Sequence, residues 1–407
     1  TGIRIIDGGG IGLTITYDGH VSGGPIDAGE YTLMLQAIKL TQPVEIRARL
    51  SIIADPRTLW KNIPSDQNDR FAKPDKAFDF KKSEEAFIVA ASVRGRSHAQ
   101  EGIFRDDHFS IHADASNGWH ILVVADGAGS AKLSREGSRI ACDTVMECLP
   151  RYLAEDVDPK LKDFVAEYDE NQGSWAEKVR TELLYPVLPR VAQEAAASIE
   201  DAAQNQGHKL QDFSTTIVIA VSKKVSGKWF TASFTIGDGG VAIFDAKSEK
   251  VAVLCRADSG EFAGQTRFLA NSEFRDSDDV LGRIFVDLRD HFTVLAVMTD
   301  GITDPKFPTD AAFKKPEKWV EFWTDSLTRE VTLSPENHRL EIEMLEWLDF
   351  WSRGNHDDRT IALMMPETGQ CEISGKDGTS QEIANETLDI EETGACASFE
   401  EEGYNDE

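Results

Sequence analysis

Buried strands that meet acidic residues at their ends are the feature of this sequence that most restricts its fold. Three apolar segments end on an Asp-Gly pair, and two more begin directly after an acidic pair. The Asp-Gly pairs are Asp126-Gly127, Asp238-Gly239 and Asp300-Gly301, the last with Asp304 close behind, and the acidic pairs are Asp106-Asp107 and Asp357-Asp358. A single Asp-Gly pair after a strand usually makes an ordinary turn. If all these strand ends converge, however, their carboxylates repel one another and resist burial, so they need cations.

The residue types around these strand ends favour Mg²⁺ or Mn²⁺ over other metals. Carboxylate and carbonyl oxygens are the ligands that these cations prefer, whereas zinc and copper sites use His or Cys side chains, which the motifs do not pair. A glycine after the Asp lets the backbone approach an ion, so that its carbonyl oxygen can also serve as a ligand.

The composition of the chain favours a cytoplasmic protein. The formal net charge of −28 repels phosphate backbones and anionic lipids, so we expect neither nucleic acid nor a membrane as a partner. No apolar run approaches the roughly 18–20 residues of a membrane span, and the first residues do not read as a signal peptide. The five cysteines are odd in number and contain no CxxC pair, which favours a reducing compartment over a disulfide framework.

From Ala86 onward the chain predicts an α+β fold. Strand-like segments such as "AFIVAASV", "WHILVVAD", "STTIVIAV" and "HFTVLAVMTD" are separated by helical stretches between Ser134 and Gly207 and by "RLEIEMLEWLDFWSRG". The strands follow one another at hairpin-like spacing instead of alternating regularly with helices. This order favours a sandwich of antiparallel sheets over a parallel, doubly wound sheet.

The sequence divides into four parts. Residues 1–55 predict a β-rich accessory module, because apolar and polar residues alternate through "VEIRARLSII"; it serves either as a binding adaptor or as cover for part of the main domain. Residues 56–85 are polar, contain three prolines and are interpreted as a linker. Residues 86–366 form the main domain. In residues 367–407 acidic residues far outnumber the single basic residue, Lys376, so a disordered tail is expected.

Taken in order, the motifs resemble those of the metal-dependent serine/threonine protein phosphatases of the PP2C family, most closely its divergent bacterial branch. The motifs are "SVRGRSH", a step to Asp106-Asp107, "DGAGS", "TT", "GDG", "TDGITD" and "DDRT", and the likeness covers roughly Ala86 to Met365. The resemblance implies two antiparallel β-sheets packed face to face and flanked by helices, an α-β-β-α sandwich.

The resemblance also implies a metal centre. Asp126 would bridge two metals and Gly127 would give its carbonyl oxygen. One metal would bind Asp107, with Asp106 beside it, and the other would bind the two carboxylates Asp300 and Asp357. A weaker third-metal site would consist of Asp238, Asp300 and Asp304. The implied chemistry is hydrolysis of phosphoserine and phosphothreonine by water activated between two Mn²⁺ or Mg²⁺ ions, with the catalytic set Asp126, Asp107, Asp300 and Asp357.

Two positions depart from the family pattern. Where animal members have a His after the Asp-Gly pair, this chain has Ala128, so the candidates for the general acid are metal-bound water, His98 and His356. Where the family usually has a phosphate-binding Arg, this chain has Gly102. The candidates to replace it are Arg94, Arg96 and Arg105.

Three functions agree with these observations. The leading hypothesis is a phosphatase acting on a phosphoprotein, with a cognate Ser/Thr kinase as a further candidate partner. The alternative is a catalytically weak, phosphatase-like module that binds a phosphoprotein or a kinase. A third hypothesis is metal-dependent hydrolysis of a small phosphorylated metabolite. The complete set of aligned carboxylates favours an enzyme, because a non-catalytic module has no need to keep repelling charges together.

Overall fold

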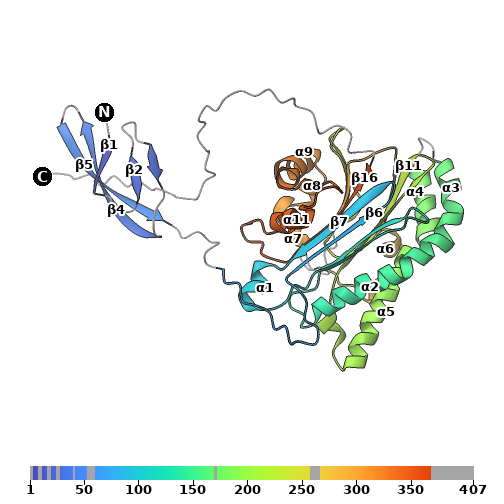
Figure 1. Cartoon of the computed structure of the whole chain (residues 1–407). Helices are drawn as coiled ribbons and strands as arrows, with labels where there is room; N and C mark the ends of the chain where they lie inside the picture. The colour runs from blue at the N-terminus through green and yellow to red at the C-terminus, as the bar shows by residue number, and fades with distance from the viewer. Residues whose placement is uncertain are drawn as a thin grey trace. The chain divides into compact units, whose positions relative to one another are not determined.

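The structure, a computed structural model, describes residues 3–7, 12–15, 20–23, 28–39, 42–52, 60–168, 172–256 and 266–367 (Figure 1). These residues belong to two compact units, one ending at Lys61 and one beginning at Asn62. The acidic tail expected over residues 367–407 lies outside the described residues, apart from Glu367.

The first unit contains a three-stranded antiparallel sheet and a two-stranded ribbon. The sheet has the order β1 (Ile3–Asp7), β4 (Gly29–Lys39) and β5 (Gln42–Ile52), and the ribbon pairs β2 (Leu13–Ile15) with β3 (Val21–Gly23). Its buried apolar side chains are Leu33, Leu35, Ala48 and Leu50. On the same face of β5, Val44 and Ile46 are 37% and 40% exposed. The apolar alternation of β5 thus buries only part of one face, and the core of this unit is thin.

The second unit is built on two antiparallel sheets. The six-stranded sheet has the order β13 (Lys250–Val253), β12 (Gly240–Asp245), β15 (Val294–Met298), β16 (Arg359–Pro366), β7 (Ala86–Val93) and β6 (Lys76–Lys82). The five-stranded sheet has the order β14 (Ile284–Arg289), β11 (Lys228–Ile236), β10 (Ile217–Val225), β9 (His120–Ala125) and β8 (His108–Ala113). All strand pairs with a described register are antiparallel.

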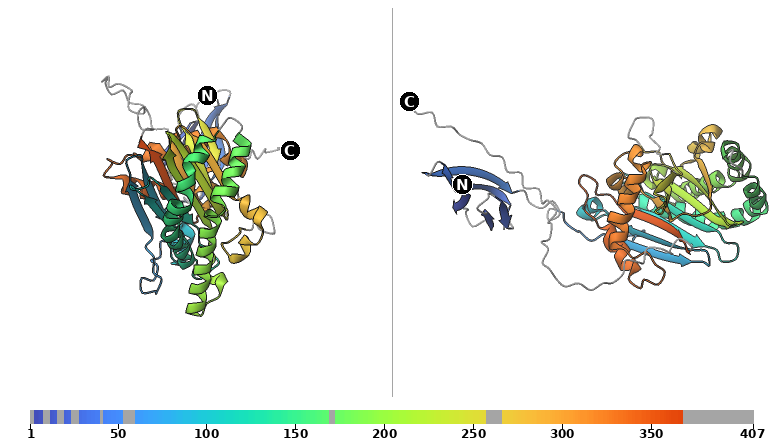
Figure 2. Two further views of the ribbon diagram at one scale, coloured as in Figure 1. Left: turned by 90° about the vertical axis from the view of Figure 1, so that its right-hand side faces the viewer. Right: turned by 90° about the horizontal axis from the view of Figure 1, so that it is seen from above.

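Helices cover the outer faces of both sheets (Figures 1 and 2). On the five-stranded sheet lie α2 (Ser134–Tyr152), α3 (Asp158–Ala166), α4 (Gln172–Lys178) and α5 (Leu188–Gln206), with π-helical turns at Leu153–Val157 and Val179–Leu184. The six-stranded sheet is covered by α7 (Asp300–Lys306), α8 (Asp310–Phe313), α9 (Pro316–Val320), α10 (Thr328–Glu330) and α11 (Leu340–Leu348), with a π-helical segment at Glu321–Leu327.

The remaining short helices are α1 (Arg96–Glu101), α6 (Ser277–Leu281) and two 3₁₀ segments, Leu210–Phe213 and Asn271–Phe274. They lie in the segments that connect the strands and longer helices of the second unit. Within the part of the chain that the structure describes, no helix is both long enough and apolar enough to cross a lipid bilayer.

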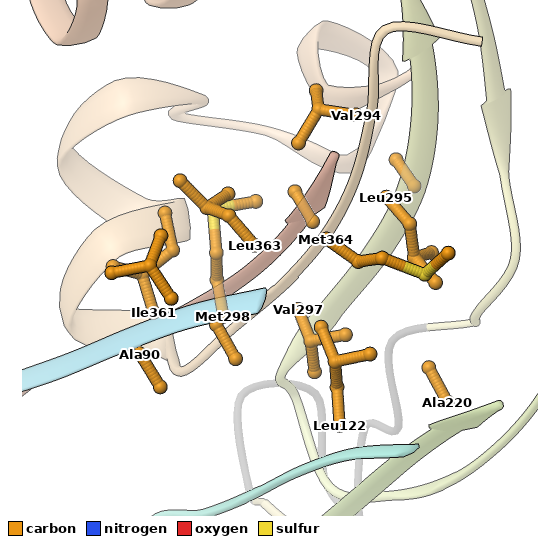
Figure 3. Packing of buried hydrophobic residues seen from close by; sticks show 14 of the residues in the cluster. Ala90, Leu122, Ala220, Val294, Leu295, Val297, Met298, Ile361, Leu363 and Met364 are labelled. Atoms are coloured by element: carbon orange, nitrogen blue, oxygen red, sulfur yellow. The ribbon is translucent and has the colours of Figure 1, made fainter. Parts of the chain in front are cut away.

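Alternation of side chains explains how the layers pack. Along β9, Leu122 and Val124 enter the core between the sheets, whereas Ile121 and Val123 pack against the helical layer. Leu122 faces Val297 of the opposite sheet in this core (Figure 3). Both faces of the central strands are therefore buried, which is why their sequences are continuously apolar. The predicted α+β sandwich of two antiparallel sheets flanked by helices is confirmed.

The structure differs from the predicted linker in the second half of residues 56–85. Residues 76–82 form β6, which pairs along its whole length with β7. Phe78 and Phe80 are partly buried against the core between the sheets. An edge strand tolerates charged residues where a central strand does not. The lysines at both ends of β6 therefore made this strand difficult to recognise in the sequence.

Candidate metal centre

The Asp residues at the strand ends converge at one end of the sandwich. Asp126 follows β9, Asp238 lies in the turn between β11 and β12, and Asp300 begins α7 directly after β15. One carboxylate oxygen from each of these three residues lies within 4.8 Å of the others. Antiparallel pairing of strands from distant parts of the chain thus brings three like charges into one site.

Asp107 adds a carboxylate that is already oriented by the protein. Its Oδ2 atom accepts hydrogen bonds from the hydroxyl groups of Thr299, at 2.9 Å, and Thr360, at 2.6 Å. Its Oδ1 atom is buried and has no hydrogen-bond partner among the described residues. Asp238 is similar, because Thr266 donates to its Oδ2 atom at 2.5 Å while its buried Oδ1 atom has no such partner within the same residues.

The pKa shifts of these carboxyl groups show that their charges interact. Burial raises the pKa of Asp126 and of Asp300 well above the usual value, and the negative charges of neighbouring carboxylates raise both further. The same two causes, burial first and then the charge of Asp358, raise the pKa of Asp107 to about 7 and that of Asp106 to about 6. Asp357 and Asp304 also have raised pKa values, mainly through burial. A divalent cation would counteract these shifts, because it favours the charged form of each carboxyl group.

The backbone around Asp126 leaves no room for a larger residue at the next position. A Cβ atom on Gly127 would lie 2.8 Å from the carbonyl oxygen of Asp106 and 2.9 Å from the Cβ atom of Ser134. Thr215 and Thr216 fix Asp126 from the other side: its carbonyl oxygen accepts from the Thr215 hydroxyl and the Thr216 N–H, both at 2.8 Å. The Asp-Gly pair is thus held close to neighbouring backbone.

Asp358 is a site residue that the sequence analysis did not single out. Its Oδ1 atom accepts hydrogen bonds from the N–H of Gly95, at 2.6 Å, and from Nδ1 of His98, at 3.0 Å. Its Oδ2 atom accepts from the backbone N–H groups of Asp106 and Asp107. Burial acts to raise the pKa of Asp358, but its hydrogen bonds and the charge of His98 hold it below the usual value. Asp358 therefore ties three segments together as an ionised acceptor.

Of the two histidines considered as general acids, His98 lies against the acidic cluster. Its Nε2 atom is 3.9 Å from the Asp106 carboxylate and 4.0 Å from that of Asp357. Burial acts to lower the pKa of His98, but the hydrogen bond and charge of Asp358 raise it to about 10. His356 precedes Asp357 in the chain, and burial lowers its pKa. His98 is thus a cation at neutral pH, placed among carboxylates.

The three arginines considered for phosphate binding donate to protein groups. Arg94 donates to Asn62, Asp75 and two backbone carbonyls. Arg96 donates to Asp349 and to the Phe350 carbonyl. Arg105 donates to the carbonyls of Pro74 and Asp107. Arg105 is also 1% exposed. These contacts favour a role in holding loops over one in binding phosphate.

A cavity of about 260 Å³ borders the acidic cluster. Asp238 and Asp304 form part of its wall, and Phe307 and Phe313 form an apolar part. The cavity is also lined by two basic side chains that the sequence analysis did not identify, Arg256 and Lys314. A ligand in this cavity would therefore meet carboxylates, cations and aromatic rings together.

The fold and this acidic centre define a class of β-sandwich proteins with a carboxylate-lined site. A family model described as "Protein phosphatase 2C" matches residues 94–349. The chain therefore belongs to the protein phosphatase 2C family, whose members are metal-dependent protein phosphatases. The match ends before Asp357 and Asp358, which the structure nevertheless brings to the same site.

Solved structures with a similar chain path are distant in sequence. A bacterial serine phosphatase is 15% identical, with 69% of this chain and 97% of that chain covered and a TM-score of 0.39. The serine/threonine phosphatase Stp1 from Staphylococcus aureus is 14% identical, with 73% and 98% covered and a TM-score of 0.39. A C. elegans sex determining protein is 10% identical, with 70% and 66% covered and a TM-score of 0.43. A search of curated proteins found no match.

Proposed function

We propose that this protein hydrolyses phosphoserine and phosphothreonine in proteins with the help of two divalent cations. The observation that carries the proposal is the convergence of buried and half-buried carboxylates, which include two buried oxygens without a hydrogen-bond partner among the described residues, Oδ1 of Asp107 and Oδ1 of Asp238. Buried polar atoms normally have a partner, and oxygen-only donors fit Mn²⁺ or Mg²⁺. A chain with no catalytic task would gain stability by losing these repelling charges.

The proposed ligands are those that the family resemblance implies, and the proximity of the carboxylates supports them. Asp126 would hold both ions, and the carbonyl oxygen of Gly127 would contribute to the same site. Asp107, with Asp106 beside it, would serve one ion, and Asp300 and Asp357 would serve the other. A weaker third site would use Asp238, Asp300 and Asp304, of which Asp238 and Asp304 line the cavity. Bound cations supply an activated water and neutralise negative charge on the phosphoryl group.

The protein's own side chains prepare the site for this chemistry. Thr299 and Thr360 occupy one oxygen of Asp107, so that only Oδ1 is left for a ligand. Asp358 holds the backbone of the turn that carries Asp106 and Asp107. Fixed orientation of the ligands reduces the reorganisation needed during reaction, and no protein nucleophile is required.

The cavity beside Asp238 and Asp304 is our candidate for the approach of the phosphoprotein. Lys314 and Arg256, the latter paired with Asp279, lie on its wall beside the carboxylates of Asp238, Asp304 and Asp310, so an anionic substrate would be attracted once divalent cations offset these negative charges. The proposed partners are a phosphoprotein and its cognate kinase, and the proposed compartment is the cytoplasm. The cysteines in the described part of the chain, Cys142, Cys148 and Cys255, are free, which agrees with a reducing compartment.

The experiment compares three substrates with the full chain in the presence of Mn²⁺, Mg²⁺ or EDTA. The substrates are phosphoserine and phosphothreonine peptides, a small aryl phosphate and a sugar phosphate. We expect hydrolysis only with a divalent cation and a higher kcat/KM for phosphopeptides than for the sugar phosphate. Binding of phosphopeptide without turnover would instead identify the phosphatase-like module, and a preference for the sugar phosphate would identify a metabolite phosphatase.

A further inference from the structure

A buried lysine lies behind the turn that carries Asp106 and Asp107. Lys73 is 7% exposed and comes from the segment before β6, ahead of the residues matched by the family model. Its Nζ atom donates to the carbonyl oxygens of Asp107, at 2.6 Å, and Asp106, at 3.4 Å. It also reaches the carbonyl oxygen of Arg135, at 3.4 Å, and the hydroxyl oxygen of Ser138, at 3.3 Å.

Burying a lysine in this way carries a cost. Taking an ammonium group out of water is unfavourable unless several acceptors replace the water, and here four oxygens surround it. Burial, and next the charge of Arg105, lowers the pKa of Lys73 to about 7. An apolar residue of similar length would avoid this cost, so the contacts that Lys73 makes need a reason.

Lys73 and Asp358 bind the backbone of the same two residues, Asp106 and Asp107, and together form what we call a clamp. Asp358 accepts from the N–H groups of Asp106 and Asp107 on one side of the turn. Lys73 donates to the carbonyl oxygens of the same two residues. Arg105 adds a second donor to the Asp107 carbonyl, at 3.1 Å. The backbone N–H and C=O groups of both Asp106 and Asp107 are therefore bound by buried side chains, which fixes the backbone from which the Asp107 carboxylate extends.

We propose that Lys73 is a positioning residue for the metal ligand Asp107, supplied by the segment that precedes the family-matched part of the chain. The proposal rests on the proposed function, because it takes Asp107 as a ligand. A ligand must be held within about 0.5 Å of its productive position, and side chains behind a metal ligand typically contribute roughly 10–100-fold to metal affinity. Lys73 acts through the backbone of Asp107 and does not touch the substrate.

The test uses Lys73→Met, which keeps the length of the side chain and removes its donors. The matched control is Lys76→Met, an exposed lysine three residues further on. We expect Lys73→Met to weaken Mn²⁺ binding roughly 10-fold in calorimetric titration of the full chain. The KM for Mn²⁺ in aryl phosphate hydrolysis should rise in parallel, while the KM for the aryl phosphate stays within about twofold. Lys76→Met should match the wild type in all three measurements.

The outcomes separate this inference from the proposed function. If the wild-type protein binds no Mn²⁺ and hydrolyses no phosphoester, the proposed function is wrong. If the wild type binds Mn²⁺ and folded Lys73→Met binds it equally well, only the positioning role is overturned. Should Lys73→Met fail to fold, Ser138→Ala decides, because the Ser138 hydroxyl contacts both Lys73 and the Asp106 carbonyl. Mn²⁺ affinity weakened severalfold supports the clamp, and unchanged affinity contradicts it.

Discussion

Two groups of charged side chains in the second unit use the same residue type in opposite ways. At Asp279, three arginines surround the carboxylate: Arg283 donates at 2.9 Å, Arg267 donates at 3.3 Å, and Arg256 also donates. Burial acts to raise the pKa of Asp279, but the hydrogen bonds from Arg256 and Arg283 hold it below the usual value. At Asp126 the neighbours are other carboxylates, and the pKa is raised.

The opposite pKa shifts of Asp279 and Asp126 distinguish a charge that stabilises the fold from a charge that requires a bound cation. Asp279 finds its positive partners within the chain, so its ionised form contributes to stability. Asp126 and Asp300 have other carboxylates as their charged neighbours, so their ionised forms oppose folding until a cation joins them. A cluster of carboxylates that lacks positively charged side chains is therefore a better sign of a metal site than the mere presence of acidic residues.

The largest expected effect comes from replacing the proposed bridging ligand. Asp126→Asn should lower kcat/KM for a phosphopeptide at least about 1,000-fold, about 4 kcal/mol in barrier height, because both cations lose a shared ligand. The melting temperature of the metal-free protein should stay the same or rise, because one repelling charge is removed. Steady-state kinetics and thermal unfolding in EDTA measure the two quantities. A variant that stays active at low Mn²⁺ would remove Asp126 from the site.

Replacing the paired carboxylate should have the reverse pattern. Asp279→Asn removes the nearer carboxylate partner of the fully buried Arg283 and leaves Glu273 at 3.8 Å, so we expect the free energy of unfolding to fall by about 2–3 kcal/mol in denaturant titration. Mn²⁺ affinity and the kcat of the folded protein should not change. Asp278→Asn, at the exposed neighbouring position, is the control and should unfold like the wild type. A loss of Mn²⁺ affinity in Asp279→Asn would show that the two groups of charges are not independent.

The smallest expected effect, taken per pH unit, is a dependence of metal-free stability on pH. Asp106 and Asp107 have folded-state pKa values of about 6 and about 7, above the ordinary 3.8. Between these limits the folded protein keeps protons that the unfolded chain has released, so the free energy of unfolding falls as the pH rises. Between pH 5 and pH 7 we expect a loss of about 1–2 kcal/mol per pH unit in EDTA.

Saturating Mn²⁺ should remove or reverse this trend, because metal binding requires deprotonated carboxylates and so strengthens as the pH rises. Asp107→Asn should flatten the metal-free profile over the same range. Denaturant unfolding at pH 5, 6 and 7, with EDTA and with Mn²⁺, provides the comparison. A metal-free protein that becomes more stable from pH 5 to pH 7 would contradict the raised pKa values.

The strand ends could be predicted from the sequence because their pattern is local. An apolar run followed by Asp-Gly contains both the strand and its end, and the order of the motifs led to the α+β sandwich that the structure confirms. The proximity of Asp126, Asp238 and Asp300 was inferred from the same pattern and agrees with the structure. Their roles as metal ligands stay predictions.

What the sequence did not reveal depends on contacts between distant segments. Asp358 cannot be distinguished from its neighbour Asp357 by residue type. Only the fold shows that Asp358 accepts hydrogen bonds from Gly95, Asp106 and Asp107. Lys73 lies in a polar, proline-containing stretch, where a lysine normally faces solvent. It is buried against Asp106, Asp107, Arg135 and Ser138, which are distant from it in the sequence.

The position of β16 has a consequence for how the protein is made. This strand is the last one described in the second unit, yet it lies in the middle of the six-stranded sheet, between β15 and β7. A chain still on the ribosome therefore holds two incomplete half-sheets with open edges, and such edges invite pairing with other chains. Asp357 and Asp358 emerge together with this strand. The nascent chain thus gains its continuous six-stranded sheet and its complete acidic centre in the same step, after nearly all of the unit has been synthesised.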